Sequence, residues 1–212
     1  MTGKALLAAS ALLLAHPAPA AGPEGHYRAV GEPDVASELL LEPDGHFRYF
    51  LSAGALDERA EGRWMVKGTR LRLVTEPKPV APVFSEGAAE RTDEGRLTLK
   101  VDWPDGSGIA GVDLAVGFDS GAPVEGYTQY YGWTMPARET RAPRWVEFAV
   151  PMHGLVSQRF PIDTEKANAL TFILTPNDLG VVDFAGRTLR YEDGRIVMRG
   201  GQGSLTYERV ED

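Results

Sequence analysis

The chain has 212 residues, 30 of them acidic and 22 basic, so its formal net charge is −8 at pH 7. The linear sequence shows no basic cluster, and this argues against binding of nucleic acid or of an anionic membrane surface. The chain contains no cysteine, which excludes disulfide bonds and a lipid attached to an N-terminal cysteine.

The first twenty residues have the pattern of a secretory signal peptide. Lys4 provides a short basic start, and an apolar run rich in Ala and Leu follows over residues 5–15. This run is too short to cross a bilayer core of about 30 Å as a helix. Ala18, Pro19 and Ala20 then supply the small residues of a cleavage site. We expect cleavage after Ala20 and a periplasmic or secreted mature protein that spans no membrane. The alternatives are a disordered Ala-rich leader and a retained N-terminal anchor.

Apolar and polar side chains alternate through most of the remaining chain. Every second side chain is apolar in residues 47–51, and the same period recurs in residues 97–103 and 112–118. Because successive side chains of a strand point to opposite faces, each run places one apolar face on a core. Asp-Gly pairs at residues 44–45 and 193–194 suit tight hairpins. The sequence therefore predicts an all-β fold, with antiparallel meanders that form a barrel or sandwich and a second small β-sandwich unit.

The order of these runs predicts a discontinuous arrangement. We expect residues 21–90 and 167–212 to form one β-barrel or meander domain, with residues 96–160 inserted as the sandwich-like unit. Three prolines within residues 76–82 mark the first boundary. Closing a barrel with the C-terminal strands would remove exposed strand edges. The rival arrangement is three segments in serial order. Helix is scarce: residues 34–40 could form one turn or enter a strand directly, and the best helix candidate is a short connector in residues 163–169.

Two parts of the sequence resemble known β-proteins. The run from Asp34 to Trp64 contains DVASEL, DGHFRY, GALDE and GRW. It resembles a widespread group of uncharacterised exported bacterial proteins and, more distantly, the opening strands of lipocalin-like barrels. The pattern GIAGVDL at residues 108–114, followed by GYT at 126–128 and GW at 132–133, is similar to the prealbumin-like, carboxypeptidase-regulatory-type sandwich. The first resemblance implies a barrel with no assigned activity, and the second implies a non-catalytic module.

One aromatic cluster is the candidate ligand-binding site. Tyr127, Gln129, Tyr131 and Trp133 occupy alternate positions, so in a strand they would line one face. Aromatic faces stack on sugar rings and apolar ligands, while tyrosine hydroxyls and the indole N–H add hydrogen bonds. The competing interpretation is that this face is part of the sandwich core.

Other residues show no complete catalytic or metal-binding pattern. His26 and His46 could share a sheet, but two histidines without a third ligand make an incomplete metal site. The sequence has no Gly-x-Ser-x-Gly elbow. We therefore expect no catalytic residue, metal or cofactor, and a non-enzymatic binding or interaction module of the cell envelope. The expected partner of this module is a small apolar ligand, a carbohydrate or an envelope protein. The alternative functions are a hydrolase with a spatially assembled active site and a structural envelope subunit.

Overall fold

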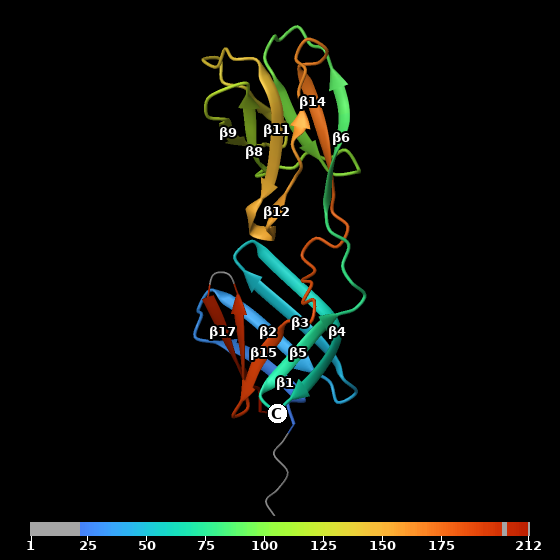
Figure 1. Cartoon of the computed structure of the whole chain (residues 1–212), viewed down its shortest axis with the longest axis vertical. Helices are drawn as coiled ribbons and strands as arrows, with labels where there is room; N and C mark the ends of the chain where they lie inside the picture. The colour runs from blue at the N-terminus through green and yellow to red at the C-terminus, as the bar shows by residue number, and fades with distance from the viewer. Residues whose placement is uncertain (1–21, 201–202, 212) are drawn as a thin grey trace, which may run out of the picture.

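The computed structural model describes residues 22–200 and 203–211, and it confirms the all-β class predicted from the sequence. The expected signal peptide, residues 1–20, lies outside these described residues. Figure 1 shows two β-units, a lower barrel and an upper sandwich, joined by two connecting segments. Within the described residues, no helix has the length and apolar character needed to cross a membrane.

Eight antiparallel strands close the barrel in the order β1-β17-β16-β15-β5-β4-β3-β2. The N-terminal five are β1 (Gly25–Val30), β2 (Val35–Leu41), β3 (His46–Ala53), β4 (Leu56–Lys67) and β5 (Arg70–Thr75). The C-terminal three are β15 (Thr188–Glu192), β16 (Arg195–Gly200) and β17 (Gly203–Arg209). Tyr27 of β1 lies opposite Arg209 of β17, so strands distant in sequence complete one sheet that has no open edge.

Packed side chains fill the inside of the barrel. Leu71 and Leu73 of β5 are fully buried, whereas Arg70 and Arg72 beside them are exposed. This alternation is the period-two pattern seen in the sequence. An eight-stranded barrel is just wide enough for side chains to fill. The buried hydrophobic residues of this core are Tyr27, Leu39, Leu41, Phe47, Tyr49, Ala60, Leu71, Leu73, Phe184, Leu189, Ile196, Met198 and Tyr207.

The sandwich consists of two sheets that share a second core. One sheet has the order β10-β7-β14-β6 and contains β6 (Val83–Glu90), β7 (Thr98–Asp102), β10 (Trp133–Thr134) and β14 (Ala169–Thr175). The other has the order β12-β11-β8-β9, with β13 paired to β11, and contains β8 (Asp113–Phe118), β9 (Val124–Tyr127), β11 (Pro143–Val150), β12 (Leu155–Val156) and β13 (Phe160–Pro161). Phe148 of one sheet meets Phe84 and Phe172 of the other, with ring centroids 5.5 and 4.8 Å apart.

The strand pairing differs from the segments expected for the barrel. Residues 21–90 and 167–212 each include one strand, β6 and β14, that pairs in the sandwich. Phe84 of β6 and Phe172 of β14 are buried in the sandwich core. Both rings pack against Phe148 of β11, and this burial explains why β6 and β14 belong to the sandwich and not to the barrel. The local sequence of β6, which is rich in Gly and Ala, has no clear alternation that would assign it to either unit.

Two connecting segments, residues 76–82 and 176–187, run between the barrel and the sandwich and contact each other. The Val80 amide donates to the Asp178 carboxylate at 2.7 Å, and the Asp178 amide donates to the Val80 carbonyl at 3.1 Å. Past this contact, Phe184 is buried among the side chains of the barrel core. The second connector is therefore also part of the barrel.

The short helix expected in residues 163–169 is not formed. The amides of Lys166 and Ala167 both donate to the Asp163 carbonyl at 3.1 Å, and this single turn leads directly into β14. So short a segment gains too few helical hydrogen bonds to offset the cost of starting a helix. The one helical element among the described residues is a 3-10 helix at Pro151–His153.

Candidate functional site

The four aromatic-cluster residues predicted from the sequence do not share a strand face. β9 ends at Tyr127, and Gln129 then pairs with Gly132 across a tight turn. Gly132 has a φ of 99°, a conformation that favours glycine. Trp133 begins β10, which belongs to the other sheet of the sandwich. The chain thus crosses between sheets inside the cluster, and alternation in the sequence does not continue through the turn.

These residues consequently have different surroundings. Tyr131 is 82% exposed at the tip of the turn, next to Tyr130, which is 74% exposed. Trp133 is partly buried against the sandwich core. Tyr127 is 59% exposed and lines a groove on the outer face of β8, β9 and β11. Of the predicted residues, Tyr127 is therefore the one that combines an accessible ring with a hollow.

The groove beside Tyr127, here called the tyrosine groove, has a volume of about 510 Å³. The small side chain of Ala115 lies on its central strand, directly between Glu125 of β9 and Glu147 of β11. Asp113 lies opposite Tyr127 on the same face. Opposed side chains on neighbouring strands have Cβ atoms only about 4.5–5.5 Å apart. The two glutamates therefore form walls on either side of a low floor.

The carboxylates of the tyrosine groove differ in their partners. Glu147 accepts a hydrogen bond from Arg159 Nε at 3.4 Å. Asp113 and Glu125 have no ion pair within the part of the chain that the structure describes. The groove therefore offers two carboxylates without a cationic partner beside an exposed tyrosine ring. The sequence pattern does not identify Asp113 and Glu125 as site residues, because they lie on different strands, β8 and β9, and most of the residues between them do not line the groove.

Trp145 lies flat against the backbone on the same outer face. It pairs with Gly117, and a Cβ placed on Gly117 would be 1.9 Å from its Cε2 atom. The guanidinium of Arg159 lies 3.9 Å from the centre of the indole ring. This cation–π contact and the close glycine contact hold the indole and orient the arginine that pairs with Glu147.

Buried hydrogen bonds fix the end of β9. Thr128, which follows Tyr127, is fully buried, and its hydroxyl donates to the Ile109 carbonyl at 2.6 Å. The same oxygen accepts from the Val112 amide at 3.1 Å, and the Gly111 amide donates to the Thr128 carbonyl at 2.7 Å. These bonds join the end of β9 to the loop before β8, so the backbone that carries Tyr127 is held in place.

A cluster of possible metal ligands lies at the turn between β2 and β3. The ligand atoms of Glu42, Asp44 and His46 are within 4.8 Å of one another. His46 Nδ1 is 2.9 Å from the Asp44 carboxylate, and Glu42 is paired with Arg48 at 3.0 Å. Hydrogen bonds from the His46 backbone and ring lower the pKa of Asp44 below its ordinary value. The sequence suggests His26 and His46 together as an incomplete metal site, but His26 is not part of this cluster.

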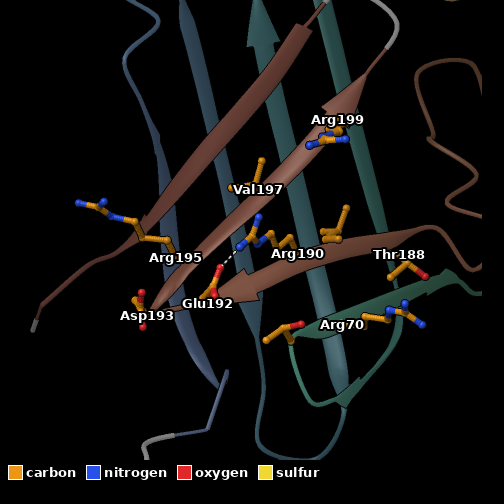
Figure 2. Close-up of a pocket in the computed structure, with 10 residues that line it drawn as sticks. Arg70, Thr188, Arg190, Glu192, Asp193, Arg195, Val197 and Arg199 are labelled. Carbon is orange, nitrogen blue, oxygen red and sulfur yellow. Dashed lines mark hydrogen bonds and ion pairs between the residues drawn. The ribbon is translucent and has the colours of Figure 1, made fainter.

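A second groove lies on the outside of the barrel and is lined by arginines (Figure 2). Its volume is about 670 Å³, and its walls come from β5, β15 and β16. The linear sequence shows no basic cluster, whereas the folded barrel gathers four arginines along this groove. Arg190, Arg195 and Arg199 lie within ten residues of one another in the sequence, and the pairing of β15 with β5 adds Arg70 to them. The arginines that line this arginine groove are Arg70, Arg190, Arg195 and Arg199.

Comparisons with protein-family models, with curated proteins and with solved structures found no match to this chain. The resemblance of residues 34–64 to lipocalin-like barrels and that of residues 108–133 to prealbumin-like sandwiches therefore stay predictions.

Proposed function

We propose that this protein is a non-enzymatic binding module whose ligand is a carbohydrate held in the tyrosine groove. The observation that carries the proposal is the combination of an exposed Tyr127 ring with carboxylates across a low floor. Sugar rings present apolar C–H faces that stack on aromatic rings. Their hydroxyls donate to carboxylates, and such charge-assisted hydrogen bonds are about twice as strong as neutral ones.

The dimensions of the tyrosine groove support a small sugar ligand. Its volume of about 510 Å³ lies inside the range of roughly 300–1,000 Å³ that is typical of small-molecule sites. Ala115 keeps the centre of the groove low, while Glu125 and Glu147 rise on opposite sides of it. The export signal expected at residues 1–20 would deliver such a module to the cell envelope, where polysaccharides are exposed.

The proposal is tested by binding of a panel of neutral oligosaccharides, measured by isothermal titration calorimetry. We expect Tyr127→Ala to weaken binding about tenfold, because the stacked ring is worth roughly 0.5–1.5 kcal/mol beyond its buried area. Glu125→Gln should also weaken binding, because a charged acceptor becomes neutral. Tyr131→Ala is the matched control: its ring is exposed too, but it lies outside the groove.

Two outcomes would contradict the proposal. One is that no oligosaccharide of the panel binds. The other is that Tyr131→Ala weakens binding as much as Tyr127→Ala, which would locate the ligand on the turn instead of in the groove.

A hydrolase is the second candidate, and the opposed pair Glu125 and Glu147 favours it. Glycoside hydrolases use two carboxyl groups that face each other across the scissile bond. Release of reducing ends from a bound oligosaccharide, lost in both Glu125→Gln and Glu147→Gln, would establish catalysis. Binding without release of reducing ends supports the binding module.

A further inference from the structure

The arginine groove concentrates positive charge on an acidic protein. The chain has a formal net charge of −8, yet four of the residues that line this groove are arginines and two are acidic. Alternation along β5, β15 and β16 points Arg70, Arg190 and Arg199 outward, while Leu189 and Ile196 point into the barrel core. Figure 2 shows Arg190, Arg195 and Arg199 around the half-buried Val197, and Arg70 on the far side of β15.

Two of these arginines are direct cross-strand neighbours. Arg190 of β15 lies opposite Arg70 of β5 on one side and opposite Val197 of β16 on the other. Like charges directly opposite each other destabilise a sheet. The ion pair of Arg190 with Glu192 offsets part of this repulsion, and a ligand that bridges Arg70 and Arg190 would remove the rest.

Acidic residues of the protein neutralise only part of this charge. Arg190 is paired with Glu192, and Arg195 is paired with Glu208 at 2.8 Å (Figure 2 marks the first pair). Arg70 and Arg199 have no ion pair among the residues that the structure describes. Both are exposed, so their guanidinium groups are available to an anion.

The positive charge extends along the groove. Arg195 and Arg199 are four residues apart on β16, and a strand rises about 3.3 Å per residue, so their Cα atoms are separated by roughly 13 Å. The facing pair of Arg70 and Arg190 joins this row at Val197, midway between them. The groove therefore has more than one place for an anionic group.

We propose that the arginine groove binds a small ligand that carries at least two phosphate groups. The planar guanidinium fork matches phosphate oxygens in a bidentate manner. In Figure 2 the Arg70 and Arg190 side chains point away from each other, so one phosphate would bridge them after both turn inward, and a second would reach Arg199. A volume of about 670 Å³ suits a small molecule. This inference is independent of the sugar proposed for the other groove, because the two sites lie on different units of the protein.

The test uses the full chain and three inorganic probes: orthophosphate, pyrophosphate and tripolyphosphate. Affinities are measured by isothermal titration calorimetry at low salt and again at high salt. We expect affinity to rise along this series, because the longer anions engage additional arginines, and to fall with salt. Citrate, an anion that carries carboxylates in place of phosphates, should bind more weakly than tripolyphosphate.

Variants assign the binding to the groove. Arg70→Gln and Arg199→Gln should each weaken tripolyphosphate binding about tenfold or more, the usual size of a lost hydrogen bond to a charged group. Arg138→Gln is the matched control, because Arg138 is an exposed arginine of the sandwich. The melting temperature of Arg70→Gln should stay level or rise, since one of two facing positive charges is removed; a purely structural arginine would give the opposite result.

Three results would overturn the inference. The first is no detectable binding of tripolyphosphate, and the second is unchanged binding by the Arg70→Gln/Arg199→Gln double variant. The third is that citrate or a single-stranded oligonucleotide binds more tightly than tripolyphosphate, which would replace the small phosphorylated ligand by a carboxylate ligand or a nucleic-acid backbone.

Discussion

Gly117 allows the indole of Trp145 to lie against the backbone of β8. A Cβ at this position would be 1.9 Å from the Trp145 Cε2 atom. We expect Gly117→Ala to displace the indole and to lower the free energy of unfolding by about 1–3 kcal/mol. Urea denaturation followed by tryptophan fluorescence measures this change. In a Trp145→Ala background the same substitution should cost far less, because the clashing ring is gone; an equal cost in both backgrounds would contradict the steric explanation.

Buried tyrosine hydroxyls form a second residue-scale feature, inside the barrel. The Ser37 hydroxyl donates to the Phe50 carbonyl at 2.7 Å, so the Tyr207 hydroxyl, 2.8 Å from Ser37 Oγ, is the donor in their shared hydrogen bond. Tyr49 donates to the Glu58 carboxylate at 3.3 Å. Burial, which disfavours the charged phenolate, raises the pKa of both tyrosines above their ordinary value of 10.0.

These raised pKa values predict a loss of stability at alkaline pH. Below pH 10, the ordinary tyrosine pKa, folded and unfolded chains both keep the protons of Tyr49 and Tyr207. Above it the unfolded chain releases them while the folded chain retains them, so stability falls as pH rises. Tyr207→Phe should flatten this decline, although its lost hydrogen bond costs about 1 kcal/mol at neutral pH. Denaturant titrations at neutral and strongly alkaline pH test this, with Tyr131→Phe as the exposed control; equal declines in all three proteins would refute it.

At the scale of elements, the connector that returns from the sandwich completes the barrel. The ring of Phe184 lies 5.6 Å from that of Phe47 and 5.2 Å from that of Tyr49, edge-on in both cases. The Phe184 amide donates to the Thr75 hydroxyl at 3.0 Å, and this hydroxyl donates to the Val182 carbonyl at 2.8 Å. The end of β5 and the connector therefore hold each other in place.

Truncation of this aromatic side chain should destabilise the barrel selectively. We expect Phe184→Ala to cost about 3–5 kcal/mol, because it leaves a cavity in the barrel core. Hydrogen exchange read by mass spectrometry should show lost protection in β3 and β5 and unchanged protection in β8 and β11. Val80→Ala is the control in the other connector, where the side chain is 60% exposed. Equal loss of protection in both units would show that they unfold together.

At the scale of the whole molecule, the sandwich leaves and rejoins the barrel connectors at neighbouring points. Val83 and Thr175 are antiparallel Cα partners, and opposed Cα atoms are about 4.5–5.5 Å apart. Replacing residues 83–175 by a short Gly/Ser linker should therefore leave a barrel that unfolds cooperatively in denaturant. Removing only residues 96–160 should cause aggregation, because Phe84 and Phe172 would lose their cover.

Deletion of residues 188–212 is the complementary experiment. It removes β15, β16 and β17 and leaves β1 and β5 with open edges, so the remaining barrel strands should become sensitive to protease. Protection of residues 25–75 in this truncated chain would contradict the closed barrel as a unit of stability.

Local alternation was sufficient to predict the class of fold. Strand β5 shows why: Arg70 and Arg72 point outward to solvent, and Leu71 between them points into the core. Consecutive residues of one strand therefore reveal which face is exposed and which is buried. Local patterns failed where a turn or a bare strand interrupts the period. Residues 129–132 turn between two sheets, and β6 has almost no apolar side chains to alternate.

The composition by itself determined that this chain is acidic, and the period-two pattern determined that it is an all-β protein. Neither property depends on contacts between residues that are distant in the sequence. Only the tertiary structure decided what its surfaces offer. Strand pairing places Glu125 and Glu147 on the two sides of Ala115, and it places Arg70 directly opposite Arg190. The members of each pair are distant in the sequence. Both grooves are products of sheet register, and register depends on the closure of whole sheets around their cores.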